Sequence, residues 1–189
     1  MAYLSRTIAL LSLVLATAAH SFELQDHSRS INATEKTIFS PNTNFAVCFT
    51  PGQDCEGVII NEINHAQKSI LVQAYSFTST AIAKALKDAK NRGVDVRAIL
   101  DKSQRTERYS SATFLKNADI PVVIDAKPEI AHSKVLVIDQ LSVLTGSYNF
   151  THAAKSKNAE NIILITGDTR LVQAYTKNWN TRMNVSVPY

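Results

Sequence analysis

The chain has 189 residues, of which 45% are hydrophobic and 19% are charged. That length supports one substantial hydrophobic core and excludes two full domains, which would need more residues. The formal net charge of +4 excludes a strongly acidic protein and suits an anionic partner, although many soluble proteins are equally basic.

The first residues have the pattern of a secretory signal peptide. Arg6 precedes an apolar run from residue 8 to residue 16, and Ala16-Thr17-Ala18 supplies the small residues that signal peptidase recognises. The run is short for a membrane span, and no stop-transfer pattern follows it. We therefore predict a signal peptide over residues 1–21 and export to the periplasm or the cell exterior. An uncleaved anchor is the alternative.

Residues 22–42 are polar and aperiodic, which predicts a loosely ordered leader to a single domain over residues 43–189. The domain begins with a strand, because Phe45, Val47 and Phe49 alternate with smaller residues. A turn at Pro51-Gly52 follows.

Two cysteines, Cys48 and Cys55, flank this turn. Cysteines of exported proteins tend to pair, so we expect a disulfide worth about 2 to 3 kcal/mol. Metal ligation is the alternative, but two cysteines without an adjacent histidine pair make a poor zinc site.

Helices and strands then alternate along the chain. The first helix has apolar residues at helical spacing: Ile59, Ile60, Ile63 and Ala66. A strand over 70–75 leads to a helix that Ser79 or Thr80 caps and Gly93 ends, and a strand over 94–100 follows. This order of elements implies a right-handed crossover between parallel strands.

The second half continues the alternation. We predict a short helix over 112–115, strands over 122–124, 132–138, 142–145 and 161–165, and a final helix over 169–183. A tight turn at residues 139–141 joins two of these strands. The pattern predicts an α/β fold with a mixed, largely parallel central sheet and helices on both faces.

Residues whose side chains could take part in catalysis are concentrated between positions 131 and 161. They are His132, Lys134, Asp139, Ser147, Asn149, Asn158 and Glu160. Side chains two apart on a strand project to the same face, so His132 and Lys134 should point the same way. An imidazole, an ammonium and an amide at one spot would suit a phosphate group.

The spacing of these residues resembles the phospholipase D superfamily. His132, Lys134 and Asp139 match its HxKxxxxD signature, and residues 146–151 (GSYNFT) resemble its GSxNxT element. Residues 73–78, 92–96 and 157–161 are similar to the small bacterial Nuc-type endonucleases of that superfamily. The resemblance covers nearly all of residues 45–183.

The resemblance implies a role for each motif residue. His132 would attack phosphorus and form a phosphohistidine, while Lys134 and Asn149 would hold the phosphoryl oxygens and Ser147 would help to fix the site. Glu160 would orient His132 through its other ring nitrogen, which selects the tautomer needed for attack. Asp139 has the opposite parity to His132, and we expect it to hold the turn.

The chain carries a single copy of this motif, whereas long members of the superfamily carry two. The leaving oxygen needs a general acid, and a second His132 across a two-fold axis could provide it. We therefore expect a homodimer with a shared active site.

The substrate that these features favour is nucleic acid, DNA or RNA, cut with little sequence specificity. Lys102, Arg105 and Arg108 lie in a polar loop where they could contact the phosphate backbone, a solvated loop being the alternative. A phospholipase is the rival enzyme and a catalytically silent nucleic-acid-binding module a further alternative. We expect neither a cofactor nor a metal ion, since the chain has no HExxH and no obvious carboxylate cluster.

Overall fold

A computed structural model describes residues 37–189, of which residues 38–189 form one compact unit. The predicted signal peptide and most of the predicted leader lie outside the described residues. The strands are β1 (Asn44–Thr50), β2 (Ser69–Ala74), β3 (Asp95–Asp101), β4 (Val122–Asp125), β5 (Lys134–Ile138), β6 (Ser142–Gly146), β7 (Glu160–Thr166) and β8 (Val187–Pro188). The helices are α1 (Cys55–His65), α2 (Thr80–Asn91), the 3-10 helix η1 (Lys102–Arg105), α3 (Ala112–Asn117), α4 (His152–Ser156) and α5 (Thr169–Val185).

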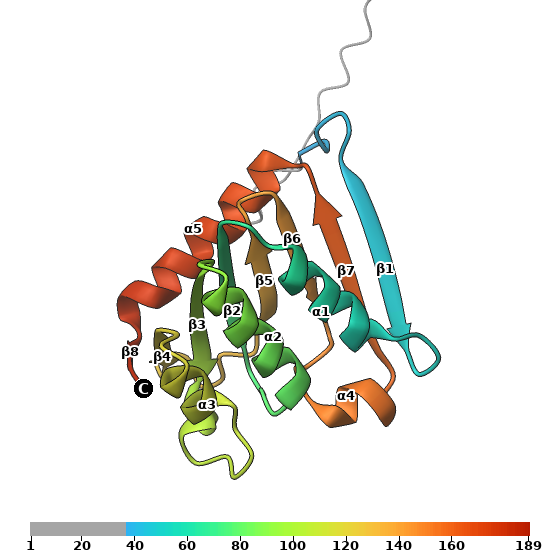
Figure 1. Cartoon of the computed structure of the whole chain (residues 1–189). Helices are drawn as coiled ribbons and strands as arrows, with labels where there is room; N and C mark the ends of the chain where they lie inside the picture. The colour runs from blue at the N-terminus through green and yellow to red at the C-terminus, as the bar shows by residue number, and fades with distance from the viewer. Residues whose placement is uncertain (1–36) are drawn as a thin grey trace, which may run out of the picture. The chain divides into compact units, whose positions relative to one another are not determined.

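One sheet joins the strands in the order β1-β7-β6-β5-β2-β3-β4-β8 (Figure 1). The sheet is mixed, as predicted, but the expectation that it is largely parallel is wrong. Among the seven strand pairings within residues 37–189, only β2–β3 and β3–β4 are parallel. A parallel pair needs a crossover of about a dozen residues or more, whereas three residues join β5 to β6, so these strands must run antiparallel.

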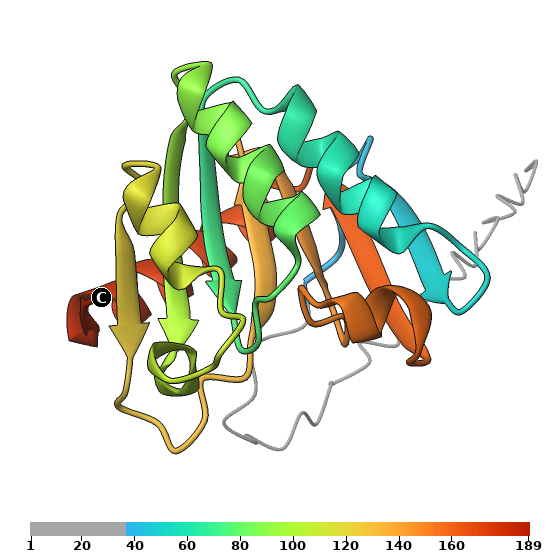
Figure 2. The ribbon, with the colours of Figure 1, turned by 60° about the horizontal axis from the view of Figure 1, so that its bottom comes forward.

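Helices cover both faces of the sheet, which confirms the predicted layers (Figure 2). Helices α1, α2 and α3 lie on one face, and α5 lies on the other. Trp179 of α5 is fully buried against Ile99 and Val123, and its indole N–H donates a hydrogen bond of 3.0 Å to the Val72 carbonyl. This helix is therefore anchored to the centre of the sheet.

Helix α5 covers only part of the sheet face on which it lies. It packs against β2, β4, β5 and β6, while β1 lies at the opposite edge of the sheet (Figure 1). On β1, Phe45, Val47 and Phe49 are 74%, 48% and 54% exposed, whereas Cys48 and Thr50, which have the opposite parity, are buried. We call Phe45, Val47 and Phe49 the β1 apolar face. Within residues 37–189, no described helix is long and apolar enough to cross a membrane.

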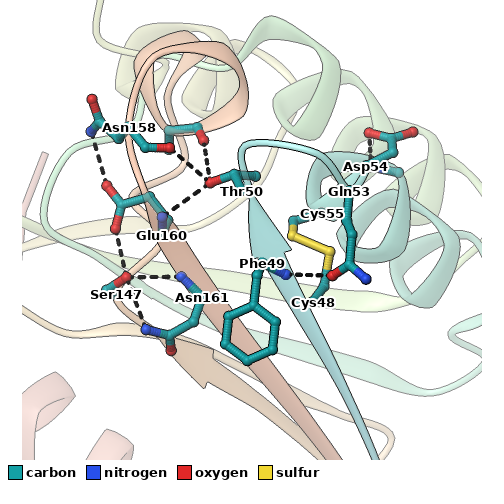
Figure 3. The surroundings of a disulfide bond; sticks show 12 residues. Cys48, Phe49, Thr50, Gln53, Asp54, Cys55, Ser147, Asn158, Glu160 and Asn161 are labelled. Atoms are coloured by element: carbon teal, nitrogen blue, oxygen red, sulfur yellow. Dashed lines mark hydrogen bonds between the residues drawn. A yellow bond between two sulfur atoms is a disulfide. The ribbon is translucent and has the colours of Figure 1, made fainter.

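The predicted disulfide between Cys48 and Cys55 is present, which removes both thiols from the alternative role of metal ligands. It joins the end of β1 to the start of α1 across a turn that contains Pro51 and Gly52 (Figure 3). The cross-link therefore restrains the edge strand that precedes the active-site strands.

Replacement of both cysteines by serine should lower the free energy of unfolding by about 2 to 3 kcal/mol, because the unfolded chain loses a closed loop. Urea titration of the oxidised protein and of the double variant measures this difference. Reductant should lower the stability of the native sequence to that of the variant and leave the variant unchanged. Equal midpoints for the oxidised protein and the variant would refute the expectation.

Candidate active site

The motif residues other than Asp139 lie at one end of the strands, which we call the carboxyl edge. The parallel strands β2, β3 and β4 end there, β5 and β7 begin there, and β6 ends there. Ligands of open α/β sheets bind beyond the carboxyl ends of parallel strands. The chain thus delivers its polar side chains to the edge where a ligand is expected.

His132 and Lys134 contact each other at this edge. The Lys134 Nζ lies 3.0 Å from Nδ1 and 3.1 Å from Nε2 of His132, and it donates a hydrogen bond of 2.7 Å to the His132 carbonyl. Lys134 is only 6% exposed, whereas His132 is exposed to solvent. An ammonium group beside an open imidazole is an arrangement that can receive a phosphate.

The predicted strand start at residue 132 is wrong, because β5 begins at Lys134. The His132 carbonyl accepts from the Lys134 side chain, and the Ala131 N–H donates to Asp101 Oδ2 at 2.7 Å. These backbone groups are therefore unavailable for a strand ladder. The two side chains meet, but the reason is a folded-back lysine rather than strand alternation.

Burial lowers the pKa of the Lys134 ammonium, and the negative charge of Glu160 opposes this effect. The net effect is a pKa of Lys134 below the ordinary lysine value of 10.5. A buried cation loses hydration, so it gains more than a surface lysine from an anion that enters the site.

This shift predicts the alkaline limb of the pH profile. As pH rises through the pKa of Lys134, the site loses its cation, so kcat/KM should fall at a pH below 10.5. The alkaline limb of the kcat profile should lie at a higher pH than that of kcat/KM, because bound phosphate stabilises the ammonium. Both profiles can be measured with a small chromogenic phosphodiester from neutral pH upward. A kcat/KM limb at or above the ordinary lysine value would contradict the prediction.

Ser147 and Glu160 are connected by a hydrogen-bond network at the start of β7 (Figure 3). Ser147 Oγ donates to Glu160 Oε2 at 2.6 Å, and Asn158 Nδ2 donates to Glu160 Oε1 at 2.9 Å. The Asn161 N–H donates to Ser147 Oγ at 3.0 Å. Glu160 therefore uses both oxygens on neighbours of its own chain, and no hydrogen bond joins it to His132 within the described residues.

Asn149 lies beyond the end of β6, in the segment between Ser147 and α4. Its Oδ1 atom is buried and has no hydrogen-bond partner among residues 37–189. Buried amide oxygens are normally satisfied, so an unpaired one is a feature that needs an explanation. An amide oxygen only accepts, so a phosphate cannot satisfy this atom, and the Nδ2 group of the same side chain is the donor that could bind a phosphoryl oxygen.

Asp139 lies at the other end of β5, away from His132 and Lys134. Its carboxylate accepts backbone N–H bonds from Lys68 at 2.7 Å, from Gln67 at 2.9 Å and from Ser69 at 3.0 Å. Burial raises the pKa of Asp139, but these N–H groups outweigh it and the net shift is downward. The signature aspartate therefore fastens the turn after β5 to the segment before β2.

The predicted basic residues lie in and after η1, at the carboxyl edge next to β3. Arg105 donates a hydrogen bond of 2.7 Å to the Pro188 carbonyl, and the Arg108 guanidinium lies 5.4 Å from the centre of the Tyr109 ring. Lys102 is exposed. Their contact with a substrate stays a prediction.

Two further side chains support His132, and the sequence analysis missed both. The Tyr75 ring centre lies 4.5 Å from that of His132 and 5.3 Å from the Lys134 Nζ. Asp101 accepts N–H bonds from Ala131 at 2.7 Å and from Ser103 at 2.8 Å, so it holds the segment before His132. Their position at the ends of two parallel strands was the signal that could have identified them.

A cavity of about 220 Å³ opens beside His132 on the α5 side of the sheet. Asp125 and Arg182 line it and are joined by two hydrogen bonds, of 2.6 and 2.7 Å. The hydrogen bond to Asp125 raises the pKa of Arg182, so its charge is permanent. The imidazole thus borders an open space and also contacts the lysine.

Comparisons with known proteins agree with this geometry. A family described as "Cardiolipin synthase, PLD-like domain" matches residues 59–183. A "Phospholipase D" of Rickettsia prowazekii is 44% identical over 144 residues, which cover 76% of this chain and 70% of the relative. A "Mitochondrial cardiolipin hydrolase" of Xenopus laevis is 39% identical over 114 residues, which cover 60% of this chain and 54% of the relative.

A solved structure has the same fold. The phospholipase D family member Nuc from Salmonella typhimurium aligns with a TM-score of 0.75 and 37% sequence identity. The alignment covers 78% of this chain and 98% of Nuc. The likeness thus extends over almost the whole of that protein.

Proposed function

This chain belongs to the phospholipase D superfamily and is a phosphodiesterase, and from this premise we propose that it is a metal-independent nuclease that cuts DNA or RNA. The observation that carries the proposal is the contact between the buried Lys134 ammonium and both ring nitrogens of the exposed His132. A nucleophile therefore lies beside a cation that can donate hydrogen bonds to a phosphate. The site therefore has its own positive charge and needs no ion for that purpose.

The proposed reaction has two steps. A ring nitrogen of His132 attacks phosphorus, the bond to the leaving oxygen breaks, and an acid gives that oxygen a proton. Water then attacks the phosphohistidine, loses its proton to the same group and releases His132. Lys134 and Asn149 donate hydrogen bonds to the nonbridging oxygens in both steps, and Ser147 keeps the adjoining network in place.

The acid that we propose is His132 of the partner subunit in a homodimer. Among the described residues, the other histidines are His65 on α1 and His152 on α4, and neither belongs to the motif. Among residues 37–189 Glu160 makes no hydrogen bond to His132, so its role in orienting that ring stays a prediction. Sedimentation of the mature protein tests for the dimer, and a strict monomer with full activity would contradict it.

Nucleic acid is the proposed substrate because the net charge is positive, the basic loop lies at the same edge as His132, and the structural likeness to Nuc is extensive. A lipid phosphodiesterase is the second candidate. The β1 apolar face supports it, since Phe49 pairs with Asn161 of the Ser147 network and apolar surface next to the site could bind acyl chains. A silent binding module is disfavoured because His132, Lys134 and Asn149 are all present at the carboxyl edge.

The test is digestion of plasmid DNA and of RNA by the mature protein in excess EDTA, in parallel with release of headgroup from phospholipid vesicles. Chelator-resistant cleavage of nucleic acid that His132→Ala abolishes would support the nuclease. Intact nucleic acid with released headgroup would transfer the assignment to the lipid enzyme. Inactivity in both assays with retained nucleic-acid binding would favour the silent module.

Export to the periplasm or beyond is part of the same proposal. It rests on the signal pattern of residues 1–21 and on the disulfide, which an oxidising compartment would favour. N-terminal sequencing of the protein from fractionated cells tests it. Recovery of the uncut chain from the cytosol would contradict it.

A further inference from the structure

A second hollow lies at the carboxyl edge, on the face that α1 and α2 cover. It encloses about 660 Å³ between the start of α2, helix α4 and the loop that follows η1. These three segments all lie at the same end of the sheet in both views of the ribbon (Figures 1 and 2). Its volume is in the range of small-ligand sites, and the mechanism proposed above does not use it.

The hollow is directly connected to the active-site segment. The Phe150 carbonyl accepts N–H bonds from Thr78 at 2.9 Å and from Ser79 at 2.8 Å, and both donors line the hollow. Phe150 is fully buried and immediately follows Asn149. The hollow therefore lies next to the segment that carries Asn149.

The basic side chains that line the hollow are His152 and Lys155, both on α4. Lys155 donates to the buried Glu56 at 2.5 Å, and Ser79 donates to the other oxygen of Glu56 at 2.6 Å. The hydrogen bond to Glu56 raises the pKa of Lys155, so the ammonium stays charged. An ammonium has three N–H donors, and the half-exposed side chain of Lys155 keeps others free for a ligand.

An aromatic side chain forms the other wall. Tyr109 lines the hollow and is 69% exposed, and the Arg108 guanidinium lies against its ring. A large exposed aromatic residue beside cations is the combination with which proteins bind single-stranded nucleic acid: the ring stacks on a base and the cations hold the phosphate.

We propose that this hollow binds the nucleotide that flanks the cleaved bond of a single-stranded nucleic acid. The Tyr109 ring stacks on its base, and His152 with Lys155 binds its phosphate. The inference rests on the proposed nuclease function and names the strand state of its substrate. Arg108, whose guanidinium lies against the Tyr109 ring, extends the cationic surface.

The test compares a long and a short substrate. Tyr109→Ala and His152→Gln alter exposed side chains, so both variants should fold. Lys155 is left intact, because its loss would leave the buried Glu56 carboxylate without its cationic partner. Stacking on one aromatic ring is worth about 1 to 3 kcal/mol, so Tyr109→Ala should raise KM for a single-stranded 12-mer roughly tenfold. His152→Gln should raise it about threefold, since it removes a ring hydrogen bond to the phosphate. Neither should change hydrolysis of bis(p-nitrophenyl) phosphate, which is too small to reach the hollow.

The matched controls are Phe114→Ala, which removes a half-exposed aromatic ring from α3, and Lys84→Gln, which removes an exposed charge from α2. Both should leave KM for the 12-mer unchanged. Anisotropy titration of the 12-mer against His132→Ala, with and without Tyr109→Ala, measures binding without cleavage. Tyr109→Ala should weaken it roughly tenfold.

The outcomes separate the two proposals. If the native chain cleaves the 12-mer and both hollow variants equal it in KM and binding, the inference is wrong while the nuclease stands. Equal losses on the 12-mer and on the small diester would also overturn the inference, since they indicate general damage. If the native chain neither binds nor cleaves the 12-mer but hydrolyses the diester, the nuclease proposal fails and the subsite fails with it.

Discussion

His132→Ala should reduce kcat/KM for every phosphodiester substrate by about four orders of magnitude or more, the scale seen when a covalent nucleophile is removed. The variant lacks the imidazole that we propose as the nucleophile, while Lys134 and Asn149, the proposed phosphate ligands, are still present. Its KM should therefore change far less than its kcat. Because the His132 side chain is exposed, the fold should not depend on it.

Steady-state kinetics on the small diester measures this loss, and rapid quenching followed by peptide mass spectrometry should find the phosphoryl adduct on His132. His65→Ala is the matched control, since His65 is exposed and its ring binds only the Asn61 carbonyl of its own helix. The control should keep full activity. Residual activity within tenfold of the native chain would mean that another group attacks phosphorus.

Asp139→Ala should have the largest effect on stability among the motif residues, with a loss of about 2 kcal/mol or more in the free energy of unfolding. The substitution leaves the N–H groups of Gln67, Lys68 and Ser69 without their charged acceptor, and each such bond is worth about 1.5 to 3 kcal/mol in protein interiors and less where water can replace it. Its kcat at a temperature where the variant is folded should stay near that of the native chain, because Asp139 lies at the far end of β5.

The pH dependence of the unfolding free energy provides a second test of the role of Asp139. The pKa of Asp139 is lowered in the folded chain, so its contribution is present above the ordinary value of 3.8 and is lost as pH falls below it through the folded-state pKa. The difference in unfolding free energy between the native chain and Asp139→Ala should therefore shrink in acid. Asp139→Asn, which keeps one acceptor oxygen, should recover part of the stability. A large fall in kcat for both variants would instead assign Asp139 a chemical role.

The sequence was sufficient for the strands and long helices, because alternation and helical spacing are local patterns. The predicted strand near residues 45–49 and the final helix from residue 169 are present as β1 and α5. The expectation of a largely parallel sheet was wrong, since strand direction depends on whether each connection is long enough to cross the sheet. Helix α4 and strand β8 are too short to leave a periodic signal.

The sequence predicted which residues form the candidate site better than it predicted how those residues contact one another. The motif identified His132 and Lys134, but the contact between them depends on a lysine that folds back onto a loop. Nothing local indicated that both oxygens of Glu160 would be taken by Ser147 and Asn158. Tyr75 lies in a segment that resembles the Nuc-type endonucleases, but its packing against His132 follows only from the pairing of β2 with β5.

The β1 apolar face has a consequence for handling the protein. Strand β1 is a sheet edge of seven residues without a charged side chain, and uncharged apolar edges are templates for strand addition between molecules. Without its cross-link to α1, this strand would separate more readily from β7 and expose a segment prone to form fibrils. Preparations made in a reducing cytoplasm should therefore yield insoluble material, and Val47→Lys should restore solubility.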